Sequence, residues 1–77
     1  MRAKNKLTVK QRRVYDFIVG HIAKEGFQPT HEEIRVGLGF KSPNASVEHL
    51  SRIEAAGFIE RVPGHARGIR VLERAAQ

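Results

Sequence analysis

The sequence predicts a small, mainly α-helical domain that ends in a β-hairpin, and three observations lead to this fold class. Apolar residues recur with helical spacing in the first part of the chain, and three cap signals each open a helix. Two short β-branched runs then flank a turn rich in glycine. The 77 residues are enough for one domain, and with no cysteine the domain has no disulfide or thiolate site.

The first helix is expected to begin after Thr8, which is typical of an N-cap and has Gln11 three positions later to complete a capping box. Gly26 is expected to end it. Gly20 lies inside this helix at a cost of about 1 kcal/mol relative to alanine, and the sequence gives no reason for it. One helical face carries the apolar residues Val14, Phe17, Ile18 and Ile22.

Two further helices are expected. Thr30, with Glu33 as its capping-box partner, opens a short one that ends at Gly39. Ser42 followed by Pro43 indicates a third start, which is expected to run to about residue 56. Helical spacing places Ser46, Leu50, Ile53 and Glu54 of the third helix on the core side, with Val47 at its border. The outward residues are Asn44, Ala45, Glu48 and Arg52.

The last part of the chain changes from helical to strand-like pattern. Residues 58–62 and 69–72 are the β-branched runs, and residues 63–68 form the turn-rich link between them. The order of helix, short helix, freshly capped helix and hairpin matches a winged helix-turn-helix, with three helices and a two-stranded wing. We expect residues 1–7 to be a flexible basic arm, residues 8–72 to be this domain, and residues 73–77 to be a frayed tail.

The charge of the chain indicates a nucleic-acid partner. The net charge is +6 and the isoelectric point is about 10.6. A basic group precedes Asp16, and a second group lies near the end. A solubility surface or a disordered basic tail would carry the same charge, so charge alone leaves these alternatives open.

The start of the third helix carries side chains that can read base edges in a major groove. Asn44 can bond adenine, Glu48 can accept from cytosine, and Ala45 leaves room for a thymine methyl. Ser42 and Lys41 can meet a phosphate at the helix N-terminus. Ordinary solvent-facing polar residues are the alternative for each of these positions. Further candidate backbone contacts are Lys6, Lys10, Arg52 and Arg67, of which Arg67 is placed at the wing tip and could also enter a minor groove.

Catalytic, metal and membrane functions are not expected. The four histidines form no i, i+4 pair, and no nucleotide-binding or nucleophile motif occurs. We therefore expect no catalytic residue, no metal, no cofactor and no small-molecule substrate. No apolar run is long enough for a membrane span, and the basic N-terminus lacks the apolar segment of a secretory signal, so we expect a cytoplasmic protein.

These motifs together resemble the N-terminal DNA-binding domain of the LexA repressor family, the bacterial regulators of the SOS response to DNA damage. The resemblance is carried by residues 7–18, 29–34 and 38–45, and by residues 57–60 and 67–70 of the hairpin. The most specific strings are Leu-Gly-Phe-Lys-Ser-Pro-Asn-Ala and Arg-Gly-Ile-Arg. The resemblance implies that bases are read by Ser42, Asn44, Ala45, Val47 and Glu48, and that Arg67 is the wing arginine.

Three departures from the family pattern affect the expected site. Val47 stands where well-known members have Glu, which favours a methyl contact over a carboxylate acceptor at one base pair. Ser46 replaces a usual Ala, and Ala55 with Ala56 stands where basic residues are common, so one phosphate contact is expected to be missing.

The resemblance also implies a partner and an assembly. Family members carry a C-terminal half with a Ser–Lys self-cleavage site, and this half dimerises on palindromic double-stranded operator DNA. The sequence ends before any such half, so we expect no self-cleavage and a monomer in solution, from either an excised domain or a stand-alone homologue. A winged helix that binds another protein and a non-specific basic nucleic-acid binder remain the alternative functions.

Overall fold

The computed structural model describes residues 7–65 and 67–72, and in them it confirms the winged helix-turn-helix. Its helices are α1 (Val9–Glu25), α2 (His31–Leu38) and α3 (Pro43–Ala55). The strands β1 (Ile59–Arg61) and β2 (Ile69–Val71) form an antiparallel hairpin in which Glu60 faces Arg70. Lys6, most of the predicted arm and the predicted tail lie outside the described residues.

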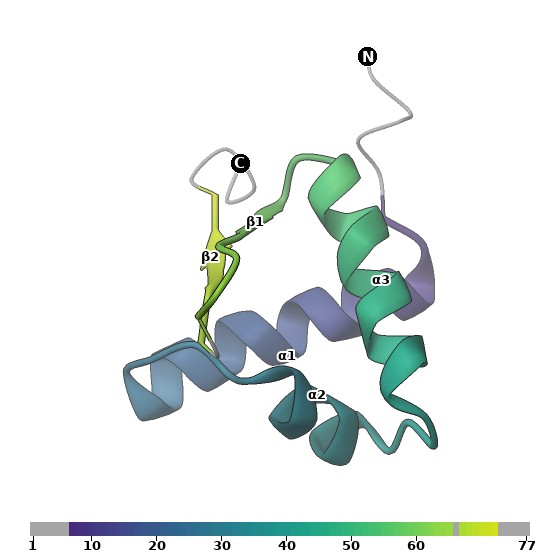
Figure 1. Ribbon diagram of the computed structural model, residues 1–77, viewed down its shortest axis with the longest axis horizontal. Helices are drawn as coiled ribbons and strands as arrows, with labels where there is room; N and C mark the ends of the chain where they lie inside the picture. Colours follow the sequence, from purple (N-terminus) through teal and green to yellow (C-terminus); the bar gives the residue numbers. More distant parts are fainter. Residues whose placement is uncertain (1–6, 66, 73–77) are drawn as a thin grey trace.

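The three helices and the hairpin enclose one core. Figure 1 shows α1 crossing the molecule, with α3 upright on one side and the hairpin on the other. Helix α3 packs against both α1 and α2, and it also contacts β1. The fully or almost fully buried apolar residues come from all of these elements and are Val14, Tyr15, Ile18, Ile34, Leu50, Ile53, Ile59 and Ile69. The α1 face predicted from spacing packs inward, with Phe17 and Ile22 only partly buried, and the packed face also includes Tyr15, which the prediction left out.

The predicted caps form where the sequence places them. Thr8 and Gln11 make a reciprocal capping box, with both backbone-to-side-chain distances at 3.1 Å. Thr30 and Glu33 make the second box, at 2.9 and 3.0 Å. The Ser42 hydroxyl oxygen accepts a bond from the Asn44 backbone N–H at 3.0 Å. These contacts satisfy helix N–H groups that would otherwise lack a partner.

Several boundaries differ from those predicted. Leu7, assigned to the arm, is half-buried and packs against the core, because it precedes the Thr8 cap and α1 directs it inward. Helix α3 ends at Ala55, with Ala56 as its C-cap and Gly57 at a φ of 90°. Both strands are three residues long, shorter than the β-branched runs around them.

Candidate nucleic-acid interface

The leading turn of α3 is open to solvent. The side chains of Asn44 and Glu48 are exposed, and Ala45 between them is half-buried. Ser46 is fully buried and donates from its hydroxyl to the Pro43 carbonyl at 2.9 Å, which leaves the outer face of the helix to its neighbours. The start of α3 lies at the end of the molecule away from the hairpin (Figure 1). The turn can therefore approach a groove without the wing covering it.

Val47 belongs to this outer surface more than to the core. Its side chain is 37% exposed, so the border position predicted from helical spacing resolves toward solvent. Val47 directly precedes Glu48 in α3. A branched apolar side chain at this place can contact a methyl group on a base edge and offers no hydrogen-bond acceptor.

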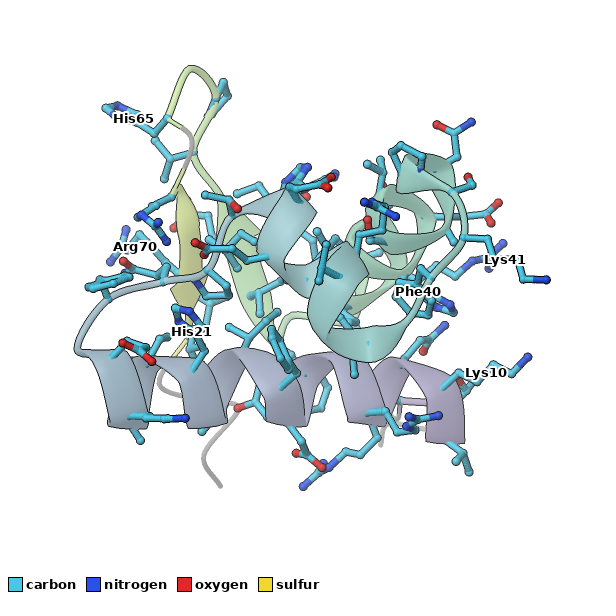
Figure 2. The ribbon with its side chains drawn as sticks, turned by 90° about the horizontal axis from the view of Figure 1, so that it is seen from below. Lys10, His21, Phe40, Lys41, His65 and Arg70 are labelled. Carbon is cyan, nitrogen blue, oxygen red and sulfur yellow. The ribbon has the colours of Figure 1, made fainter. Side chains whose placement is uncertain are left out.

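Basic side chains in the first turn of α1, just before α3 and in the last turn of α3 carry charge that no ion pair neutralises within the described residues. Lys10, Lys41 and Arg52 are exposed, and none of them forms an ion pair with a residue of the described chain. Figure 2 shows Lys10 and Lys41 pointing outward at the same end of the molecule. Charged groups of this kind can meet phosphates without first breaking an internal contact.

Other arginines are already paired with acids. The ion pairs join Arg12 to Asp16, Arg35 to Glu32, Arg61 to Glu54, Arg67 to Glu33 and Arg70 to Glu60. Most of them are side-chain contacts on the surface, where a single pair contributes at most about 1 kcal/mol. Lys10, Lys41 and Arg52 are not among these paired residues.

Arg67 does not lie at the wing tip, which corrects its predicted place. The chain turns at Gly64, with a φ of 83°, and His65 lies near the far end of the loop (Figure 2). The Arg67 guanidinium instead reaches back to the start of α2, where Nη1 and Nη2 donate to the two Glu33 carboxylate oxygens at 2.7 and 2.9 Å. A bidentate carboxylate is a stronger partner than solvent, which is the physical reason for this placement.

Sequence reasoning missed the cluster around this contact. The Arg67 guanidinium also donates to the Gln28 carbonyl at 2.8 Å and lies 4.6 Å from the centre of the Phe27 ring. His21 has Nδ1 2.9 Å from the Phe27 carbonyl oxygen and Nε2 3.7 Å from Glu33 Oε1. We call the side chains of His21, Phe27, Glu33 and Arg67, with the Gln28 carbonyl, the wing-base cluster. Arg67 is 34 positions from Glu33 in the sequence, and no local pattern connects it to the other members.

The cluster changes the acidity of Glu33. The Arg67 side-chain hydrogen bonds and then the Thr30 backbone N–H lower the pKa of Glu33 from 4.5 to about 2. The carboxylate is thus kept ionised under ordinary conditions. Elsewhere the Arg35 side chain lowers the pKa of Glu32, and the Arg61 backbone N–H and side chain lower that of Glu54.

The histidines do not gather into a metal or nucleophile site in the described part of the chain. Within residues 7–65 and 67–72, no three His, Cys, Asp or Glu side chains lie close enough together to hold a metal ion. The His49 ring stacks on Phe40 at 5.4 Å, and its Nδ1 has no partner in the structure. The Ser46 hydroxyl bonds to the backbone instead of to His49. The described helices include none with the length and apolar character needed to cross a membrane.

The fold and this surface define a winged helix-turn-helix domain of the nucleic-acid-binding class. The family described as the LexA DNA binding domain matches residues 4–68 of the sequence. The chain therefore belongs to the LexA DNA binding domain family.

Similar whole proteins are LexA repressors of bacteria. The LexA repressor of Pectobacterium carotovorum subsp. carotovorum (strain PC1) is 53% identical over 66 residues, which cover 86% of this chain and 33% of the relative. The repressor of Edwardsiella ictaluri (strain 93-146) is 52% identical with the same coverage. That of Providencia rettgeri is 50% identical, with 86% and 32% covered. The chain thus spans about a third of the length of the curated relatives it matches.

Proposed function

We propose that this chain binds operator DNA in a sequence-specific way, as the DNA-binding part of a LexA-type transcriptional repressor of the DNA-damage response. The observation that carries the proposal is the leading turn of α3. It is capped by Ser42, exposes Asn44 and Glu48, and carries the family motif. Bound at an operator, the domain would repress transcription by excluding RNA polymerase.

In this proposal the residues divide into two groups by what they contact. Bases are read by Ser42, Asn44, Ala45, Val47 and Glu48. The backbone is held by Lys10, Lys41 and Arg52, which are unpaired in the described fold, and by Lys6. The N-terminus of α3, with Lys41 before it, also favours a phosphate.

The assembly on DNA belongs to the same proposal. The relatives are about three times as long as the matched region, so pairing of two copies on a palindromic operator is inferred for the whole repressor and not seen in this chain. The place of action would be the bacterial cytoplasm, where the nucleoid carries the operators. A single domain would contact one half-site.

The first experiment identifies the duplex. Binding-site selection from random double-stranded DNA with the 77-residue chain yields a preferred duplex if the proposal holds. Its affinity is then compared with that of a scrambled duplex at two salt concentrations. We expect a clear preference for the selected duplex together with a salt dependence that reflects phosphate contacts.

The same titration separates the alternative functions. A non-specific basic binder would show steep salt dependence with equal affinity for both duplexes. A winged helix that binds proteins would show neither, and it would be expected to carry aromatic anchors on α3. The outer α3 residues Asn44, Ala45, Val47, Glu48 and Arg52 include no aromatic side chain.

A further inference from the structure

Two ion pairs join the wing to the helices. One begins in β1 and the other begins just before β2. Arg61 of β1 donates from Nε to Glu54 Oε1 at 2.9 Å and from its backbone N–H to Glu54 Oε2 at 3.0 Å. Arg67, just before β2, makes the bidentate pair with Glu33. The first contact ties the wing to the end of α3, and the second ties it to the start of α2.

The second contact is the more elaborate one. Both terminal nitrogens of Arg67 bond the carboxylate, Nη1 also bonds the Gln28 carbonyl, and the guanidinium lies against the Phe27 ring. Glu33 is itself held, because its Oε1 accepts from the Thr30 backbone N–H in the capping box. The wing is therefore fixed to the first turn of α2, the helix that precedes α3.

We infer, on the basis of the proposed function, that Arg67 is a positioning residue for DNA binding, whose pair with Glu33 fixes the wing relative to α3. A duplex that meets α3 and the wing together requires that relation to be fixed beforehand, since an ordered interface loses less freedom on binding. To bond a phosphate, Arg67 would first have to give up two charge-assisted bonds and a ring contact.

A direct contact between Arg67 and DNA would predict the opposite effect of Glu33 on DNA affinity. If Arg67 bonds DNA directly, Glu33 competes with the DNA for the guanidinium, and removing the carboxylate charge should tighten binding. If Arg67 positions the wing, removing that charge should weaken binding. Glu33→Gln suits this test because glutamine also serves as the third residue of a capping box, so α2 keeps its cap.

The experiment compares Glu33→Gln, Arg67→Ala, Arg67→Lys and the double variant E33Q/R67A, using the duplex that the unaltered chain selects. We expect each single change to weaken binding by about two- to five-fold, the order of one well-formed surface ion pair. The double variant should be no weaker than either single one, because both remove the same contact. Lysine should not rescue, since it keeps the charge but cannot form the bidentate pair.

The salt dependence of DNA affinity is the second measurement that separates the two roles of Arg67. A positioning residue leaves the slope of affinity against salt unchanged, whereas loss of one phosphate contact lowers it by about one. Tighter binding by Glu33→Gln, a lower slope for Arg67→Ala, or full rescue by Arg67→Lys would overturn the inference. Glu60→Gln is the matched control, because it adds the same charge change and removes only the exposed pair with Arg70, and it should bind as the unaltered chain does.

The wing position is also measured without DNA. Residual dipolar couplings report how β1 and β2 are oriented relative to α2 and α3, and we expect Glu33→Gln and Arg67→Ala to change this orientation while Glu60→Gln does not. Unchanged couplings in both would refute positioning even if DNA binding fell. If the unaltered chain selects no duplex, the proposed function fails, while the couplings still decide whether the pair orients the wing.

Discussion

Glu33 takes part in two contacts of different origin. Its carboxylate completes the capping box of α2 with Thr30, a contact between residues three positions apart. The same carboxylate receives Arg67 from a distance of 34 positions in the sequence. The first contact follows from local sequence, and the second required the hairpin to fold back over the helix.

The lowered pKa of Glu33 predicts how stability changes in acid. Because the folded pKa, about 2, is below the ordinary value of 4.5, ionised Glu33 stabilises the fold at pH above 4.5. This contribution is lost as the pH falls from 4.5 toward 2. Thermal unfolding should therefore show Glu33→Gln as less stable than the unaltered chain at pH 7, with the difference shrinking across that window. A constant difference down to pH 2 would contradict this.

Asn44 is the residue at which base reading can be tested most directly. Asn44→Ala removes a side chain able to form a bidentate contact with adenine, so discrimination between the selected and scrambled duplexes should fall by about 1–3 kcal/mol. The Ser42 cap persists, since it uses the Asn44 backbone N–H. Competition titrations measure the change, and the salt slope should stay the same.

Arg52→Ala provides the contrasting variant on the same helix. Arg52 is exposed and unpaired among residues 7–65 and 67–72, so as a phosphate contact it should affect both duplexes alike and lower the salt slope by about one. If Asn44→Ala discriminates between the selected and scrambled duplexes as well as the unaltered chain does, Asn44 does not read a base.

At the scale of the element, glycines inside helices show what packing requires. Gly20 in α1 has no atom within 4 Å of the position where a Cβ would stand, so nothing in the structure demands glycine there. Gly37 in α2 is different, since a Cβ would lie 2.5 Å from the Phe17 ring. One glycine is only a cost to its helix, and the other makes room for a neighbouring side chain.

These two positions predict opposite effects of alanine. Gly20→Ala should stabilise the domain by about 0.5–1 kcal/mol, because alanine loses less backbone freedom in a helix. Gly37→Ala should lose this gain or destabilise the domain, since the Phe17 ring must move. Urea unfolding of both variants gives the comparison, and equal stabilisation by the two would show that Phe17 does not restrict position 37.

Helix beginnings are the elements most fully predicted from the sequence. Thr8, Thr30 and Ser42 each cap the helix that they were expected to open, because capping depends on residues two or three positions away. The wing was predicted only in outline. Its strands are shorter than the apolar runs, and the residue placed at its tip is bound to α2.

For the whole molecule, one copy offers a single α3 to the duplex, which predicts weak binding by the monomer. A monomer contacts one half-site and lacks the gain from joining two sites. Fusion of the chain to a dimerising segment should raise affinity for a palindromic duplex by about 10²–10⁴-fold and leave affinity for a single half-site unchanged. Gel-shift titration of both forms measures this. Equal affinity for the palindrome before and after fusion would show that the domain does not bind half-sites independently.

By itself the sequence determined the order of the elements, the core face of each helix and the exposed leading turn of α3, since these depend on spacing and on neighbours a few residues apart. The base-reading roles stay predictions. Only the tertiary structure decided where Arg67 lies, because its partners come from α2 and the loop before it. A long side chain can reach several acceptors, and the fold alone determines which of them is within bonding distance.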